Sequence, residues 1–78
     1  MSNEQIKALN QIIAIIDDKA SRYKNEVYDL NRAQRIVEKK LLNDLIDDGL
    51  NIANSINPKP LDIIDDLNKL RRQLSDIS

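Results

Sequence analysis

Three pairs of adjacent aspartates are the residues of this chain best suited to bind a metal ion or to transfer protons. The pairs are Asp17-Asp18, Asp47-Asp48 and Asp65-Asp66, each after two apolar residues. Paired carboxylates can ligate Mg²⁺ or Ca²⁺, or act as acid and base. Neighbouring side chains on a helix diverge by about 100°, however, so the two carboxylates of a pair do not converge on one ion. We therefore interpret the pairs as solvated helix faces and expect no metal site.

Other chemistry is excluded by the residue types that are missing. The 78 residues include no Cys and no His, which rules out zinc fingers, iron–sulfur clusters, disulfides and imidazole-based catalytic triads. An enzyme would also need a pocket with convergent polar groups, which slender helices rarely provide. We expect no cofactor and no enzymatic activity.

A basic segment at residues 19–40 is the one feature that suggests nucleic-acid binding. It carries seven basic and three acidic side chains, whereas the whole chain has a net charge of −1. The acidic residues Glu26, Asp29 and Glu38 interrupt the cations that a duplex would require on one face. Tyr23 and Tyr28 are interpreted as core or interface anchors. Nucleic acid is therefore the alternative partner. The basic residues are Lys19, Arg22, Lys24, Arg32, Arg35, Lys39 and Lys40.

The composition predicts an all-α fold. Ile and Leu supply 22 of the 78 residues, there is no Thr, and one Gly leaves few positions for hairpin turns. The longest uncharged apolar run has five residues, at 12–16, against roughly 20 for a membrane span. The first residues lack a basic region and a small-residue cleavage site, so no signal peptide is expected. We expect a cytoplasmic protein without membrane contact.

A 3-4-3-4 spacing of apolar residues predicts one long helix, about residues 3–55. Ser2 and Gln5 have the spacing of a capping box at its start. Gln34 is the one polar residue in the apolar series, where it would fix the register of helix pairing. The series runs through Ile6, Leu9, Ile13, Ile16, Ala20, Tyr23, Val27, Leu30, Gln34, Val37 and Leu41.

The two prolines predict a turn at residues 56–59 and a shorter helix over about 58–77, with Asn57 as its N-cap. The shorter helix returns antiparallel, which places Leu67 near Gly49. The cations Lys69, Arg71 and Arg72 then face Asp44, Asp47 and Asp48. A break of the long helix at Gly49 would instead give three helices. The whole chain, residues 1–78, is expected to form one helical-hairpin domain. The residues expected to hold the hairpin together are Leu41, Leu45, Ile46, Gly49, Ile52, Ile63, Leu67, Leu70, Leu74 and Ile77.

The N-terminal part of the apolar series has no partner helix in this hairpin, which predicts self-association as a coiled coil or four-helix-type bundle. Charge leaves parallel and antiparallel pairing open. Ile12 and Ile15, beside the series, are candidates for binding another protein. The hypothesis is a non-enzymatic protein–protein interaction module, such as an adaptor, chaperone or inhibitor. The alternative is a nucleic-acid-associated regulator using the basic helix of a dimer. The expected self-association residues are Ile6, Leu9, Ile13, Ile16, Ala20, Tyr23, Val27 and Leu30.

Overall fold

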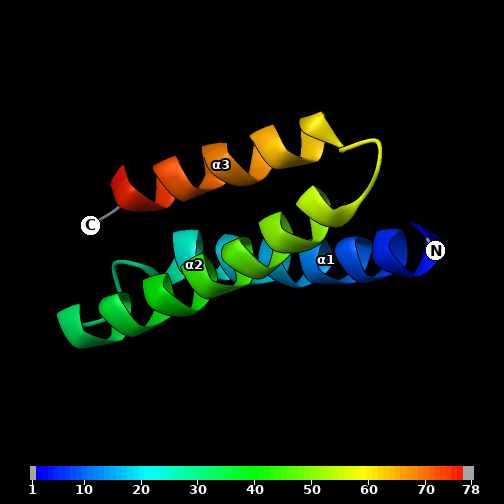
Figure 1. Ribbon diagram of the computed structural model, residues 1–78. Helices are drawn as coiled ribbons and strands as arrows, with labels where there is room; N and C mark the ends of the chain where they lie inside the picture. The colour runs from blue at the N-terminus through cyan, green and yellow to red at the C-terminus, as the bar shows by residue number, and fades with distance from the viewer. Residues whose placement is uncertain (1, 77–78) are drawn as a thin grey trace.

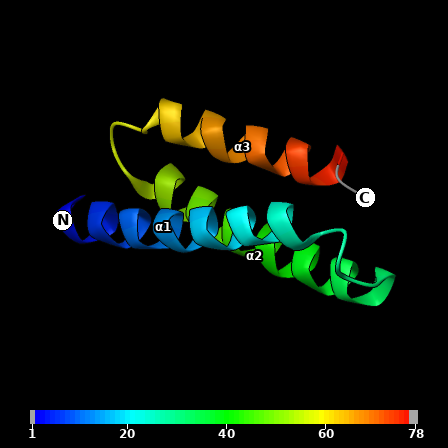
Figure 2. The same ribbon diagram turned by 180° about the vertical axis from the view of Figure 1, so that it is seen from behind.

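Three helices form the protein, in an up-down-up arrangement (Figure 1). The computed structural model describes residues 2–76, with side chains for residues 3–76, and shows helices but no strand in that range. They are α1 (Ser2–Glu26), α2 (Arg32–Ser55) and α3 (Leu61–Asp76). The view from behind in Figure 2 shows the two connections at opposite ends of the molecule. The all-α prediction is confirmed, and the molecule measures 43 × 18 × 16 Å.

The prediction of one helix over residues 3–55 is wrong, because the chain reverses at residues 27–31. Asn31 is the N-cap of α2: its Oδ1 accepts a hydrogen bond from the backbone N–H of Gln34 at 2.8 Å. In return, Gln34 Oε1 accepts from the backbone N–H of Asn31 at 2.9 Å. This capping box pairs two donors that a helix start leaves without intrahelical partners. Gln34 is therefore an exposed cap residue, not a buried register residue.

Arg35 closes the same turn from the other side. Its Nε donates to the backbone oxygens of Val27 at 2.9 Å and of Leu30 at 3.1 Å. The backbone N–H of Asp29 donates to the oxygen of Glu26 at 2.9 Å. Carbonyl groups after the last turn of a helix have no intrahelical donor, so these bonds stabilise the exit from α1. One arginine thereby joins the end of α1 to the start of α2.

Helix α2 continues without interruption through Gly49, which is buried between the other two helices. A Cβ built at Gly49 would lie 3.3 Å from Cδ1 of Leu67 and 3.6 Å from Cδ1 of Ile16. Glycine thus allows close packing of side chains from both neighbouring helices. The predicted approach of Leu67 to Gly49 is confirmed. Of the cations predicted to face the acidic residues of α2, Arg71 forms an ion pair with Asp47, whereas Lys69 pairs with Asp65 within α3.

The turn between α2 and α3 is longer than predicted. Helix α2 ends at Ser55 as expected, but α3 begins at Leu61 and not at residue 58. The oxygen of Pro60 accepts from the backbone N–H of Ile64 at 3.1 Å, so Pro60 is the residue before the first helical turn. Asn57 lies earlier in the turn and is not the N-cap. The side chains of Ser2 and Ile77, for which capping and packing were predicted, lie outside the described residues.

Two connected hydrophobic clusters form the core. The larger draws on all three helices, and the smaller closes the end near the α2–α3 turn. Ile12 and Ile63 pack against both clusters, which makes the core continuous along the molecule. The buried members of the larger cluster are Ile16, Ala20, Tyr23, Val27, Leu42, Ile46, Leu67 and Leu74. Those of the smaller cluster are Leu9, Ala53 and Ile56.

Candidate protein-interaction surface

The apolar stripe expected to drive self-association lies mainly inside the chain. Leu9, Ile16, Ala20, Tyr23 and Val27 are buried. Ile13 and Leu30 are half-buried and pack against the core, whereas Ile6 is exposed. The reversal at residues 27–31 brings α2 onto this stripe. A second chain is therefore not needed to cover it, and the physical reason for predicting self-association there is removed.

The residues expected to hold the hairpin together occupy both the core and its edge. Leu42, which is not in the expected set, is buried, whereas Leu41 is 46% exposed. The shift by one residue arises because α2 is a separate helix that begins at Arg32. Its inward-facing positions therefore do not continue the 3-4 spacing of α1. Buried members of the expected set are Ile46, Gly49, Leu67 and Leu74, and half-buried members are Leu45, Ile52, Ile63 and Leu70.

The two residues proposed for partner binding have different environments. Ile12 is half-buried, and its Cγ2 would lie 3.7 Å from a Cβ built at Gly49, so it belongs to the packing between α1 and α2. Ile15 is 46% exposed. Asp18 and Lys19, a turn further along α1, are exposed and charged. A single exposed isoleucine is ordinary for a protein surface and does not define a site.

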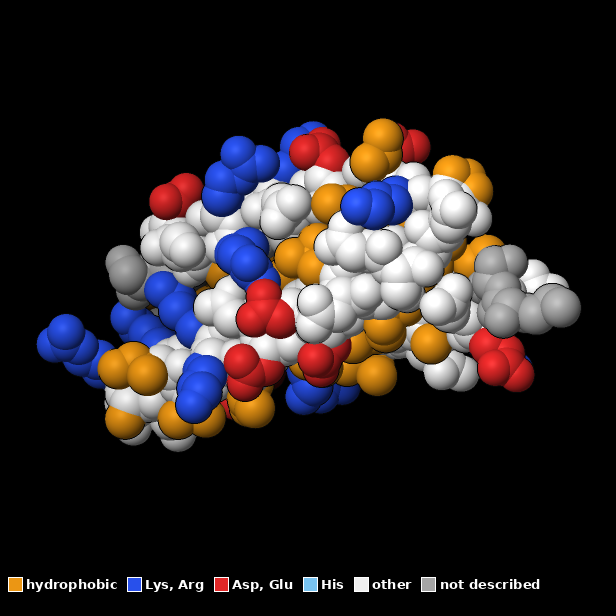
Figure 3. All heavy atoms as spheres, viewed as in Figure 1, with side chains coloured by type: hydrophobic (Ala, Val, Ile, Leu, Met, Phe, Trp, Pro, Cys, Tyr) orange, Lys and Arg blue, Asp and Glu red, His pale blue; other side chains and the backbone are white. Residues whose placement is uncertain are grey.

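A larger exposed apolar surface lies on the first three turns of α2, and the sequence analysis missed it. Ile36 is 62% exposed and Val37 is 55% exposed, and Leu41 lies one turn beyond Val37. Ala33 is also exposed, one turn before Val37. We call these four residues, Ala33, Ile36, Val37 and Leu41, the outer α2 face. Figure 3 shows apolar and basic side chains together at the end of the molecule formed by this part of α2.

The outer α2 face is exposed because it lies across the helix from the buried side that carries Leu42 and Ile46. Figure 1 shows the first turns of α2 projecting away from α3 at the end opposite the α2–α3 turn. Tyr28, in the loop at the same end, is 90% exposed. The signal that could have located this surface is the pair Asn31 and Gln34. A capping box formed by these two residues marks the start of a new helix. Val37 and Leu41 then belong to that helix, whose inward-facing side need not include them.

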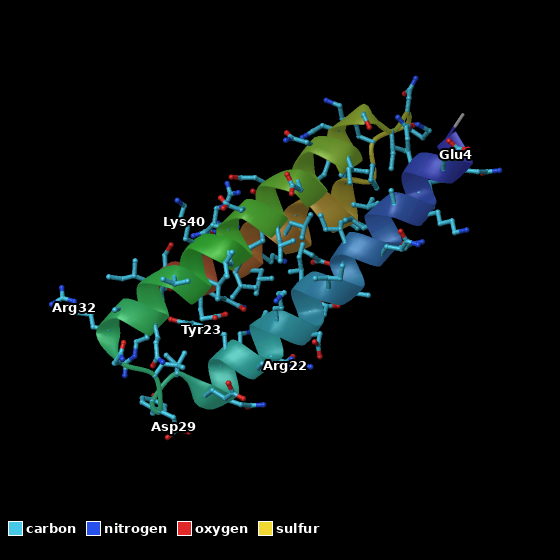
Figure 4. The ribbon with its side chains drawn as sticks, turned by 90° about the horizontal axis from the view of Figure 1, so that it is seen from below. Glu4, Arg22, Tyr23, Asp29, Arg32 and Lys40 are labelled. Carbon is cyan, nitrogen blue, oxygen red and sulfur yellow. The ribbon has the colours of Figure 1, made fainter. Side chains whose placement is uncertain are left out.

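The outer α2 face is bordered by two hollows of different charge. One, of about 350 Å³, is lined by Arg32, Arg35, Ile36 and Lys39. The other, of about 280 Å³, lies on the opposite side of the apolar row and is lined by Leu30, Ala33, Gln34, Val37 and Glu38. In Figure 4, Arg32 and Lys40 point outward on the side of α2 away from α1, whereas Tyr23 lies between the two helices. The apolar row is therefore basic along one side.

A groove between α1 and α3 is a second candidate surface. Among the described residues, no Cα of α1 lies within 8 Å of a Cα of α3. Two hollows of about 400 Å³ follow the groove and share Ile63, and Lys24 Nζ bridges its far end by donating to Gln73 Oε1 at 3.2 Å. Leu9 and Leu67 contribute to its lining but are buried. Ile6, at the end of the groove near the α2–α3 turn, is 43% exposed.

The acidic side chains and the buried phenol of the described residues were the candidates for metal or proton chemistry. No group of three or more acidic side chains within residues 3–76 is arranged to hold a metal ion. Asp18 forms an ion pair with Arg22, and Asp65 with Lys69, both at 3.2 Å and both exposed. Tyr23 Oη is buried without a hydrogen-bond partner in this part of the chain. The ring of Tyr23 packs in the larger core cluster.

Within the described range, none of the three helices combines the length and the hydropathy needed to cross a membrane. Comparison of the chain with protein-family models, with curated proteins and with solved structures found no match.

Proposed function

We propose that this protein is a non-enzymatic interaction module that binds another protein through the outer α2 face. The observation that carries the proposal is the exposure of Ile36, Val37 and Leu41 on consecutive turns of one helix. Each large aliphatic side chain gains about 1.5–3 kcal/mol when it passes fully from water into an apolar contact. Contiguous exposed apolar residues with a polar border are the usual mark of a protein-binding site.

The shape of the outer α2 face supports a helical partner. Ala33, Val37 and Leu41 are spaced i, i+4, i+8, so they form a ridge along α2 about 12 Å long. The hollows on either side of the ridge are the grooves into which side chains of a second helix insert. Ala33 at one end of the ridge allows close approach of the partner backbone. An adaptor, chaperone or inhibitor role is consistent with a small rigid bundle that presents such a ridge.

The nucleic-acid alternative is less well supported by the positions of the basic residues. Arg35 binds the backbone oxygens of Val27 and Leu30, and Arg22 pairs with Asp18, so both also have structural contacts. Arg32 and Lys39 line a hollow that also contains Ile36. A phosphate backbone contacts cations but gains little from exposed aliphatic side chains. The outer α2 face thus fits a protein better than a duplex.

Site-specific photo-cross-linking tests the proposed function. A photoreactive amino acid replaces Val37 in one variant and the exposed Asn54, near the opposite end of α2, in a control variant. We expect a discrete adduct with another protein from position 37 only, and we expect Ile36→Asp in the same chain to abolish it. Equal labelling from both positions, or an adduct that survives Ile36→Asp, would contradict binding at this face. Circular dichroism of each variant verifies that the helices are intact.

A further inference from the structure

We propose that the partner of the outer α2 face is an amphipathic helix whose apolar stripe is bordered on one side by a row of acidic residues. The inference rests on the proposed function and adds the chemistry of the partner. It starts from an asymmetry in charge. Residues 32–41 carry four cations and a single anion, Glu38. Three of the cations, Arg32, Arg35 and Lys39, line the same hollow beside Ile36.

The hollow beside Ile36 has the size and charge to receive carboxylate side chains. Its volume is about 350 Å³. Within residues 3–76, neither Arg32 nor Lys39 forms an ion pair with an acidic side chain. Guanidinium and ammonium groups bind carboxylates through charge-assisted hydrogen bonds, which are about twice as strong as neutral ones. A helix lying on the ridge of Val37 and Leu41 would place glutamates at i, i+3, i+4 or i+7 along this hollow.

The opposite side of the ridge determines on which side the partner helix can carry acidic residues. Its hollow contains Glu38 and Gln34 but no cation. Acidic residues on that side of the docked helix would face Glu38, and like charges held close together weaken an interface. The best partner therefore carries its acidic row on one side only. This one-sided pattern also fixes the direction in which the partner helix lies.

The same charges argue against a second copy of the chain on this face. Two copies related by a two-fold axis near Val37 would bring both sets of Arg32, Lys39 and Lys40 to one interface. Arg32 and Lys39 are seven residues apart, which is about 10 Å along a helix. This separation is close to the Debye length of about 10 Å at 0.1 M salt, so the repulsion between the two sets of cations is strongest at low salt. An acidic helix from another protein has no such penalty.

Two designed helical peptides provide the test. Both carry the same leucine stripe; one has glutamates along a single side of the stripe, and the other has lysines at the same positions. Titration into the full chain, followed by fluorescence anisotropy of the labelled peptide, gives the two dissociation constants. We expect the glutamate peptide to bind about tenfold more tightly than the lysine peptide at low salt, and the difference to shrink as salt is added.

Charge-reversal variants locate the selectivity. The double variant Arg32→Glu/Lys39→Glu should reverse the preference between the two peptides. Arg35 is left unchanged, because it holds the turn at residues 27–31. The control Lys7→Glu/Arg72→Glu makes the same change of net charge at exposed positions of α1 and α3 and should leave the preference as it was. Circular dichroism confirms that each variant retains its helices.

Every other result would overturn the inference, and the pattern of binding shows which part of it is wrong. Equal binding of both peptides, lost in Val37→Asp, would show an apolar interface without charge selection and leave the proposed function intact. Failure of both peptides to bind, with the position-37 adduct still formed, would show that the partner is not such a helix and would leave the proposed function intact. Preference for the lysine peptide would reverse the assigned chemistry. Tighter binding to a duplex oligonucleotide that depends on Arg32 and Lys39, or a concentration-dependent dimer lost in Val37→Asp, would assign the face to nucleic acid or to a second copy.

Discussion

Substitution of Gly49 tests the packing at the centre of the bundle, where all three helices meet. The Cβ of an alanine at this position would lie 3.3 Å from Leu67 Cδ1, 3.6 Å from Ile16 Cδ1 and 3.7 Å from Ile12 Cγ2. Leu67 must move by a few tenths of an ångström, which costs part of the roughly 1 kcal/mol that alanine gains over glycine in a helix interior. We expect Gly49→Ala to change the free energy of unfolding by less than about 1 kcal/mol.

A larger side chain at the same position has no space. Gly49→Val adds two methyl groups beyond Cβ among three packed side chains, and overpacking of this kind costs about 1–3 kcal/mol. Leu67→Ala alone should cost about 2–5 kcal/mol, because it leaves a cavity beside Gly49. In the double variant, valine fills part of that cavity. The two losses should therefore sum to at least about 1 kcal/mol more than the loss measured for the double variant.

Urea unfolding followed by far-ultraviolet circular dichroism gives all the free energies needed for this cycle. Asn51→Val is the matched control: it places valine in the same helix at an exposed position, where only helix propensity changes. If Gly49→Val is no more destabilising than Asn51→Val, or if the losses of Gly49→Val and Leu67→Ala are additive, the close approach of α2 and α3 described above is refuted.

Three further predictions use the same unfolding measurement. Asn31→Ala should lower the free energy of unfolding by about 1–2 kcal/mol, because the capping box at the start of α2 is lost, whereas Asn31→Asp should retain most of it; equal losses would refute the cap. Tyr23→Phe should leave stability unchanged or raise it by up to about 1 kcal/mol, since the buried hydroxyl has no partner within the described chain, while Tyr23→Ala should cost about 3–5 kcal/mol. A clear loss in Tyr23→Phe would reveal a hydrogen bond at that hydroxyl. Arg71→Met should cost less than about 1 kcal/mol, because its ion pair with Asp47 is solvent-accessible; a larger loss would show that the pair positions α3.

Residue patterns predicted the C-terminal half of the fold well, because its signals are local and unambiguous. Pro58 and Pro60 cannot both lie inside a helix, which required a turn there. Gly49 is the one glycine of the chain and leaves space for a facing leucine, and the opposite charges of the two helices favoured the same antiparallel direction. Direction and the approach of Leu67 to Gly49 were therefore predicted correctly, whereas the start of α3 and the Asn57 cap were not, because the prolines mark a turn without fixing its length.

The N-terminal half was mispredicted because apolar periodicity does not detect a short reversal. Val27 and Leu30 keep their 3-4 spacing across the turn, since both still face the core on either side of it. The decisive signal was polar: Asn31 and Gln34 have the same capping-box spacing as Ser2 and Gln5. Because Gln34 was assigned to the apolar series, its role in a capping box with Asn31 was overlooked. The outer α2 face could not be found without this turn, because the phase of α2 depends on where it begins.

The turn at residues 27–31 also determines which copy of the chain covers the stripe on α1. If this turn straightened, α1 and α2 would join into one long helix, and α1 could contact α2 only in a neighbouring molecule. Such a domain-swapped dimer would retain the α1–α2 packing of the closed bundle, so the core itself scarcely distinguishes the two forms. The equilibrium between the closed and the swapped form therefore depends on the five residues of the turn, including the Asn31 cap, and on the Arg35 hydrogen bonds. Substitutions that remove the Asn31 cap and the Arg35 bonds are therefore expected to favour an exchanged dimer over a closed monomer with the same interior.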